Sequence, residues 1–227
     1  AYFWLAIKDR KRRVFHRQPF ASDAQTAYDN TNIPLDRADF IPEWVWASPR
    51  SVGAGTSSYW RNPAHVGDLT SILNAGAVPV ADAIQALGTG VIQVGTLMTA
   101  AGIVQRDFFS FRTAAGWNQS RLWDITTWVG NGAASRAITF PNIGAGVTPN
   151  VVFVQPHNSS PVGMRATGAT VTTQHGGTQT TNGFSLSAGG ITVGGTSGGV
   201  YNASGVTYAA IAFINGTDPG VVPEVTF

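Results

Sequence analysis

Histidine, cysteine and the carboxylates, the side chains that most often bind metals or transfer protons, are few in this sequence and widely spaced. The chain has no cysteine, and its four histidines are His16, His65, His157 and His175. No two histidines stand at the short spacing of a zinc motif, so we expect them in loops or at the surface. Without cysteine there are no disulfide bonds and no thiolate-bound metals, and cysteine usage does not indicate whether the protein works in an oxidising or a reducing compartment.

The acidic residues are equally sparse. The densest group is Asp36, Asp39 and Glu43, which has too few oxygens for a calcium loop and fits an ion pair with Arg37 instead. Glycoside cleavage needs two facing carboxylates, and the C-terminal half of the chain offers almost none. There is no Gly-x-Ser-x-Gly motif, and the glycine-rich run 194–199 lacks the lysine of a phosphate loop. We therefore predict a protein without a catalytic site, a bound metal or a cofactor.

Tryptophan supplies most of the candidate contact residues. Four tryptophans fall near predicted turns or in a predicted linker: Trp60, Trp117, Trp123 and Trp128. An exposed ring could stack on a sugar, whereas a covered ring would pack at a subunit contact, at a joint between domains or in a core. The sequence favours packing, with the sugar contact as the alternative.

The N-terminal segment combines an apolar strand with a basic turn. Tyr2, Trp4 and Leu5 place large apolar groups on both faces of this strand, because neighbours along a strand point in opposite directions. We expect the strand either to contact another subunit or to complete the first domain's own sheet. The basic residues that follow are either an anion contact or a solvated hairpin turn: Arg10, Lys11, Arg12 and Arg13.

The composition predicts an all-β protein. Only 11% of the residues are charged, 43% are hydrophobic, and 27 are glycine. Short apolar runs separated by Gly, Pro and Asn turns are typical of sandwiches and barrels, so we expect little helix. A net charge of +2 is too small to indicate a nucleic-acid partner. The longest apolar stretch, 72–80, contains Asn74 and Pro79 and is too short to span a membrane.

Three blocks of sequence recur in the same order in the two halves of the chain. The first is a short apolar strand, a loop and a strand bracketed by prolines; the second is a hairpin with a glycine turn; the third is an apolar closing strand. The paired segments are 33–49 with 138–156, 84–96 with 184–194, and 108–111 with 210–213. The period is too long for a solenoid repeat, so the repeat indicates two related domains.

We therefore predict two tandem, related antiparallel β-sandwich domains of a jelly-roll-like kind. The predicted segments are an N-terminal strand and basic turn at 1–13, a first sandwich at 14–113, a linker at 114–124, a second sandwich at 125–215 and an extended tail at 216–227. Within the first domain, apolar residues at helical spacing predict a single helical turn over 68–73. The matching segment of the second domain, 169–174, alternates as a strand.

The second domain also carries an ordered set of motifs. Trp128-Val129-Gly130-Asn131-Gly132 is followed by a Gly-x-x-Pro strand within 144–153 and by Asn202-Ala203-Ser204-Gly205-Val206-Thr207-Tyr208 before the last strand. In this respect the segment 125–215 resembles repeat domains near the ends of tailed-bacteriophage tail fibres and other virion appendage proteins. The first domain lacks a clear Gly-Asn-Gly and shares the resemblance only through the repeat. The resemblance implies a β-sandwich in a virion rather than a chemistry.

From these observations we expect a non-enzymatic structural protein of a bacteriophage virion, assembled in the host cytoplasm. Its place would be the tail tip or tail fibre, where it would serve assembly and contact with the host surface. The expected partners are other virion proteins, further copies of the chain, and a host glycan or protein, with no nucleic acid. A capsid decoration or head-fibre protein and a free carbohydrate-binding module are the alternatives.

Overall fold

The structure is a computed structural model that describes the chain in several stretches. These are residues 15–21, 31–35, 40–50, 57–73, 78–99, 105–112, 123–157, 162–174, 179–181, 183–194 and 201–214. The predicted strand and basic turn at 1–13 and the predicted tail at 216–227 lie outside the described residues.

Strands make up nearly all of the regular structure in these stretches. The strands of the first half are β1 (Phe15–Ala21), β2 (Thr31–Pro34), β3 (Trp44–Pro49), β4 (Tyr59–Arg61), β5 (Ser71–Ile72), β6 (Ile84–Gly88), β7 (Val91–Val94) and β8 (Gln105–Phe111). Those of the second half are β9 (Trp123–Val129), β10 (Arg136–Thr139), β11 (Val151–Pro156), β12 (Gly163–Ala166), β13 (Thr172–Gln174), β14 (Gln179–Thr180), β15 (Phe184–Ser187), β16 (Gly190–Val193) and β17 (Thr207–Phe213). Within the described part of the chain the one helix is the single turn α1 (Thr96–Thr99), so the predicted all-β fold is confirmed.

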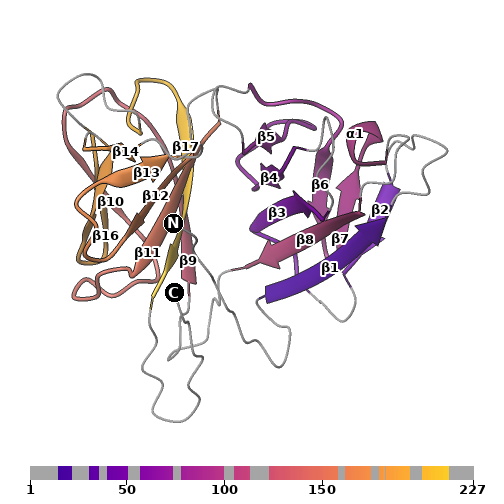
Figure 1. Ribbon diagram of the computed structural model, residues 1–227, viewed down its shortest axis with the longest axis horizontal. Helices are drawn as coiled ribbons and strands as arrows, with labels where there is room; N and C mark the ends of the chain where they lie inside the picture. Colours follow the sequence, from indigo (N-terminus) through magenta and orange to yellow (C-terminus); the bar gives the residue numbers. More distant parts are fainter. Residues whose placement is uncertain are drawn as a thin grey trace, which may run out of the picture. The chain divides into compact units, whose positions relative to one another are not determined.

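The chain divides into two compact units (Figure 1). One unit comprises 11–112 and 157–159, and the other comprises 1–10, 113–156 and 160–227. We call them the N-terminal sandwich, which holds β1 to β8, and the C-terminal sandwich, which holds β9 to β17.

Each unit has one large and one small antiparallel sheet. In the N-terminal sandwich the strand orders are β1-β8-β3-β4-β5 and β2-β7-β6. In the C-terminal sandwich they are β9-β17-β11-β12-β13-β14 and β10-β16-β15. Replacing β1–β5 by β9–β13, and β6–β8 by β15–β17, converts the first pair of orders into the second, with β14 as an added edge strand. The two units therefore share one strand plan.

The strand register is also shared. Trp44 lies opposite Phe111, and Pro49 lies opposite Arg106, across β3 and β8. The same places in β11 and β17 are taken by Val151 opposite Phe213 and Pro156 opposite Tyr208. Because a slip of one residue would turn every side chain to the other face, equal register means that equivalent positions face the same layer in both units.

The glycine-turn hairpins end the small sheets in both units. Gly90 and Gly189 have φ of 63° and 73°, a backbone conformation that glycine adopts without the steric cost of a Cβ atom. Each turn also accepts a hydrogen bond across the sheet, from Leu35 N to Gly90 O and from Phe140 N to Gly189 O. The N-terminal hairpin has one extra residue, since its register shifts between Ile84 and Ala86.

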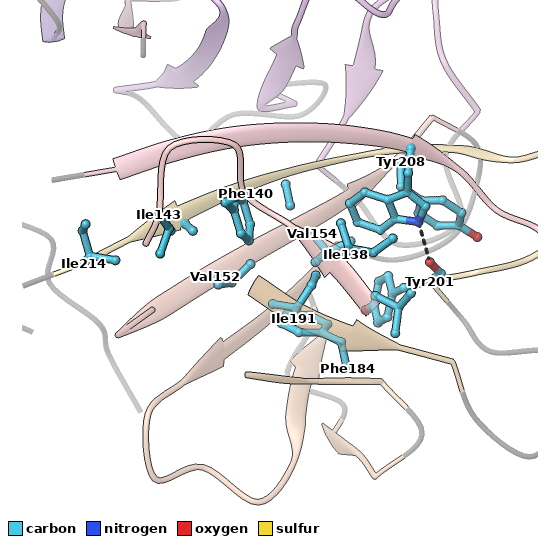
Figure 2. Packing of buried hydrophobic residues seen from close by; sticks show 14 residues of the cluster. Ile138, Phe140, Ile143, Val152, Val154, Phe184, Ile191, Tyr201, Tyr208 and Ile214 are labelled. Atoms are coloured by element: carbon cyan, nitrogen blue, oxygen red, sulfur yellow. Dashed lines mark hydrogen bonds between the residues drawn. The ribbon is translucent and has the colours of Figure 1, made fainter. Parts of the chain in front are cut away.

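A core lies between the two sheets of each unit. In the C-terminal sandwich, Val152 and Val154 of the large sheet pack with Ile138 and Ile191 of the small sheet. Figure 2 shows these side chains in the middle of the cluster, with Ile214 toward one end and Tyr208 toward the other. The N-terminal core is built in the same way, and its members include Ile33, Val45, Ile92 and Phe108.

The central strands of the large sheets are buried on both faces. All residues of β17 from Tyr208 to Phe213 are 0% exposed. In the N-terminal sandwich, the side chains on the face of the large sheet opposite the core include Trp44, Trp60 and Phe111, and none of these is more than 1% exposed. Trp44 and Trp60 stack there with ring centroids 5.1 Å apart. Near-continuous apolar runs of this kind are typical of strands covered on both sides.

Two local predictions were wrong. The segment 68–73 forms no helical turn, because Ser71 and Ile72 pair with β4 as strand β5, and Thr70 pairs with Val80. The apolar spacing there reflects burial against the sheet. The predicted linker also extended too far, because β9 already begins at Trp123 and pairs with β17 from its first residue.

Candidate functional site

A buried polar cluster lies where β4 ends in the N-terminal sandwich. Nδ1 of His65 is 2.9 Å from Oδ1 of Asn62, and Nε2 is 3.0 Å from Oγ of Ser71. The imidazole also packs edge-on against Trp60, with 4.6 Å between the ring centroids. Asn62 and His65 come from the loop that follows β4, whereas Ser71 begins β5, so the cluster ties the loop to the sheet.

The order Ser71, His65, Asn62 is that of a nucleophile, a base and an orienting group. Burial opposes this use, because the serine is 2% exposed and the histidine 7% exposed. Burial also lowers the pKa of His65 to about 2, which leaves the imidazole neutral and a weak base near pH 7. We interpret the cluster as structural. His65 lies in a loop, as predicted, but it is buried.

The side chain of Arg61 binds the backbone of the same loop. Its guanidinium donates hydrogen bonds to the carbonyl oxygens of Gly67 and Leu69, and the residue is only 6% exposed. Burial lowers the pKa of Arg61, and the nearby charge of Asp68 opposes that shift. The loop therefore supplies both the acceptor oxygens and the compensating negative charge for a buried cation.

Asp107 is a carboxylate that forms ion pairs with two arginines. Arg50 donates to both of its oxygens, at 2.9 and 2.7 Å, and Arg17 donates at 2.8 Å. Burial alone would raise the pKa of the Asp107 carboxyl, but the hydrogen bonds from Arg50 and Arg17 hold it below its ordinary value. A carboxylate occupied by two guanidinium groups joins β1, β3 and β8 and is not free to bind a ligand.

A pocket of about 200 Å³ opens in the C-terminal sandwich. Its lining residues are Thr148, Arg165, Ala166, Thr167, Gly168, Ala169, Ser185 and Leu186. Arg165 is its one charged lining residue, and Nη1 of Arg165 donates to the carbonyl oxygen of Phe184 at 2.7 Å. The pocket thus combines a cation, three hydroxyl groups and a small apolar floor.

Sequence reasoning did not single out this pocket, although a signal was present. Arg165 is the one residue among Asp, Glu, Lys and Arg between Arg136 and Asp218. A lone charge in so long an uncharged stretch indicates either a structural ion pair or a ligand site. The three hydroxyl residues could not have been assigned, because Ser and Thr are abundant throughout the chain.

The structure describes three of the four predicted contact tryptophans. Trp128 is a core residue, 6% exposed, that stacks on Tyr208 with 5.3 Å between the ring centroids and donates from Nε1 to the carbonyl oxygen of Tyr201. Trp60 is 0% exposed and Trp123 is 4% exposed. All three rings are therefore buried within the chain, which agrees with packing rather than with the alternative of sugar stacking.

The other predicted contacts lie outside the described residues: Tyr2, Trp4, Leu5, Arg10, Lys11, Arg12, Arg13 and Trp117. They stay predictions. Among the residues that the structure does describe, no group of three or more His, Asp or Glu side chains is placed to hold a metal ion. In the same part of the chain, no helix is long and apolar enough to cross a bilayer.

The fold and the pocket thus define an all-β protein of two equivalent sandwiches, one of which carries a small cationic pocket. The sequence matches no protein-family model, and no match was found among curated proteins or solved structures.

Proposed function

We propose that this chain is a non-enzymatic structural protein of a bacteriophage virion, placed at the tail tip or tail fibre, where it serves assembly and contact with the host surface. The virion setting depends on the sequence resemblance of 125–215 to virion appendage repeats. The structural role depends on the sheets themselves.

The observation that carries the proposal is the ordered motif set of 125–215, and the burial of both faces of the large sheets supports its structural part. A sandwich that works alone needs one apolar face per sheet, because the other face meets water. Here the outer positions of β17 and β3 are as apolar as the inner ones, and Phe213 and Trp44 are both 0% exposed. The chain itself covers both faces of these sheets, which gives a densely packed body suited to a structural role, and contacts with other virion proteins would lie on other surfaces.

The polar groups support the same interpretation. Asn62, His65 and Ser71 bond to one another, and Asp107 is bonded to two arginines. Each of these groups is used to fix a loop or to join strands. Catalysis needs reactive groups that a substrate can reach, and these groups are already bonded to other residues of the chain.

The test is to locate the chain in particles. Virions would be purified from a culture that carries the gene and labelled with gold-conjugated antibodies raised against the recombinant protein. Mass spectrometry of the same particles would show whether they contain the chain. Label at the distal tail supports the proposal, and label on the capsid would favour a decoration or head-fibre protein. Absence of the chain from purified particles would overturn the virion assignment.

A further inference from the structure

Arg61 and Arg165 occupy the same position in the two sandwiches. Arg61 in β4 lies opposite Val45, and Arg165 in β12 lies opposite Val152. The two valines are themselves equivalent, because each is the second residue of its strand and faces the same place in the closing strand. The two units can therefore be compared at this site as two versions of one arrangement.

In the N-terminal sandwich the chain supplies the partners of this arginine. The segment 62–69 folds back, so that the carbonyl oxygens of Gly67 and Leu69 accept hydrogen bonds from Arg61 and the charge of Asp68 lies nearby. Acceptor oxygens and a negative charge are what a buried guanidinium requires.

In the C-terminal sandwich the equivalent segment, 166–171, is shorter and carries no acidic residue. Among the described residues, Arg165 donates one hydrogen bond, to the carbonyl oxygen of Phe184. A guanidinium has five N–H donors, so most of its donor capacity is left for the pocket that it lines. No carboxylate lies among the pocket-lining residues. The segment after Arg165 therefore lines an open pocket, whereas the segment after Arg61 supplies the partners of its arginine.

We propose that this pocket binds an acidic saccharide, with the carboxylate of one sugar residue on Arg165. A guanidinium matches a carboxylate by two parallel hydrogen bonds. The hydroxyl groups of Thr148 and Ser185 can pair with sugar hydroxyls, and Leu186 offers an apolar patch to the ring. The volume of about 200 Å³ is below the roughly 300–1,000 Å³ of pockets for drug-sized ligands, which limits the site to about one sugar ring.

This inference names a ligand for the host-surface contact and depends on the proposed function for its biological setting. The binding itself is a property of the chain alone. Failure of the virion assignment would be seen in particles, whereas failure of this inference would be seen with the purified protein.

The experiment is a titration of the full chain with sodium glucuronate, followed by amide chemical shifts in ¹H–¹⁵N NMR spectra. Glucose is the neutral control, and inorganic phosphate is the control for a general anion site. We expect saturable shifts at Gly168, Ala169 and Ser185 with a Kd in the millimolar range, as for a single small ligand. Glucose and phosphate should bind at least about tenfold more weakly.

Two variants make the result specific to Arg165. Arg165→Gln should weaken glucuronate binding about tenfold, because it removes the charged partner of the carboxylate. Arg136→Gln is the matched control, since Arg136 belongs to the same sandwich, donates Nη1 to the carbonyl oxygen of Val129 and does not line the pocket. It should bind glucuronate like the unmodified chain. Thr148→Val should weaken binding less than Arg165→Gln does.

Three outcomes would overturn the inference. The first is the absence of saturable shifts at the pocket. The second is equal glucuronate binding by Arg165→Gln and the unmodified protein, with the fold of the variant confirmed by its dispersed spectrum. The third is binding of phosphate as tight as that of glucuronate, which would identify a general anion site rather than a saccharide site.

Discussion

Thr70 and Thr172 make the same pair of hydrogen bonds in the two sandwiches. Thr70 Oγ1 donates to the carbonyl oxygen of Ile84 at 2.7 Å and accepts from Ile84 N at 2.9 Å. Thr172 Oγ1 donates to the carbonyl oxygen of Phe184 at 3.1 Å and accepts from Phe184 N at 3.0 Å. In both units, a threonine hydroxyl thus bonds to the backbone N–H and C=O of the first residue of β6 or β15, as a neighbouring strand would.

The variants Thr70→Val and Thr172→Val should therefore both be destabilised. Valine keeps the shape of threonine but leaves the buried backbone N–H of Ile84 or Phe184 without this partner, which costs about 1–3 kcal/mol. The C=O of Ile84 also loses its threonine donor, whereas the C=O of Phe184 still accepts from Arg165. Urea unfolding followed by fluorescence would measure the change. Thr127→Val is the control, because Thr127 is exposed in β9, and its stability should change little. A loss in only one of the two buried variants would contradict the equivalence.

The stability of the N-terminal sandwich should fall on acidification because of His65. Burial lowers the pKa of His65 to about 2 in the folded chain, against 6.5 for an ordinary histidine. Below pH 6.5 the unfolded chain takes up a proton that the folded chain refuses, so stability is complete above pH 6.5 and is lost as the pH falls. Between pH 7 and pH 4.5 the contribution of His65 to this loss should be about 2–3 kcal/mol. His157, which stacks on His65 with 3.9 Å between the ring centroids and whose pKa burial lowers to about 4, adds to the loss over the same range.

Urea unfolding of the unmodified chain and of His65→Gln at these two pH values would test this. The variant should be less stable at pH 7, since it lacks the imidazole contacts, but it should lose less stability on acidification. An equal loss in both proteins would show that His65 is not the group responsible.

Gly130 should tolerate no side chain. A Cβ atom there would lie 2.0 Å from the carbonyl oxygen of Ala203, a backbone atom that cannot move aside cheaply. The backbone of Gly130 is also fixed, because it donates to Val206 O and accepts from Gly205 N. Gly130→Ala should therefore cost about 3 kcal/mol or more.

Gly146→Ala is the matched control for that variant. A Cβ atom at Gly146 meets nothing within 4 Å, so its thermal stability should stay within about 1 kcal/mol of the unmodified chain. Differential scanning calorimetry of the two variants would compare them directly. Equal melting temperatures would contradict the close packing of β9 against the loop at 202–206.

The sequence predicted the strand plan better than it predicted the site. The blocks around Ile33 and Ile138, and around Phe111 and Phe213, could be matched because alternation and glycine turns are local signals. The turn at 68–73 was mistaken for helix, because apolar spacing alone does not distinguish a short helix from a strand that pairs at a sheet edge. The pocket depends on the short loop after Arg165. The equivalence of Arg165 to Arg61, which shows that this loop is short, follows from the register of β11 and β12 and is not visible in the sequence.

The tryptophans show the same limit. Trp128 was placed near a turn by its neighbours Gly130 and Gly132, yet its ring packs into the core because it faces Tyr208 across β9 and β17. Which face of a strand is buried follows from its pairing, which a single sequence does not specify.

Engineered disulfides would show whether both halves hold one strand plan in one register. The chain has no cysteine, so each introduced pair reports on itself alone. Val45 lies opposite Ser110, and Val152 lies opposite Ala212. Directly opposed residues bring their Cα atoms within the roughly 4.4–6.8 Å that a disulfide spans, whereas pairs displaced by two residues are farther apart. A shared register predicts oxidation of both V45C/S110C and V152C/A212C, but not of the displaced pairs V45C/F108C and V152C/A210C. Oxidation of a displaced pair in preference to its opposed pair, in either sandwich, would contradict it.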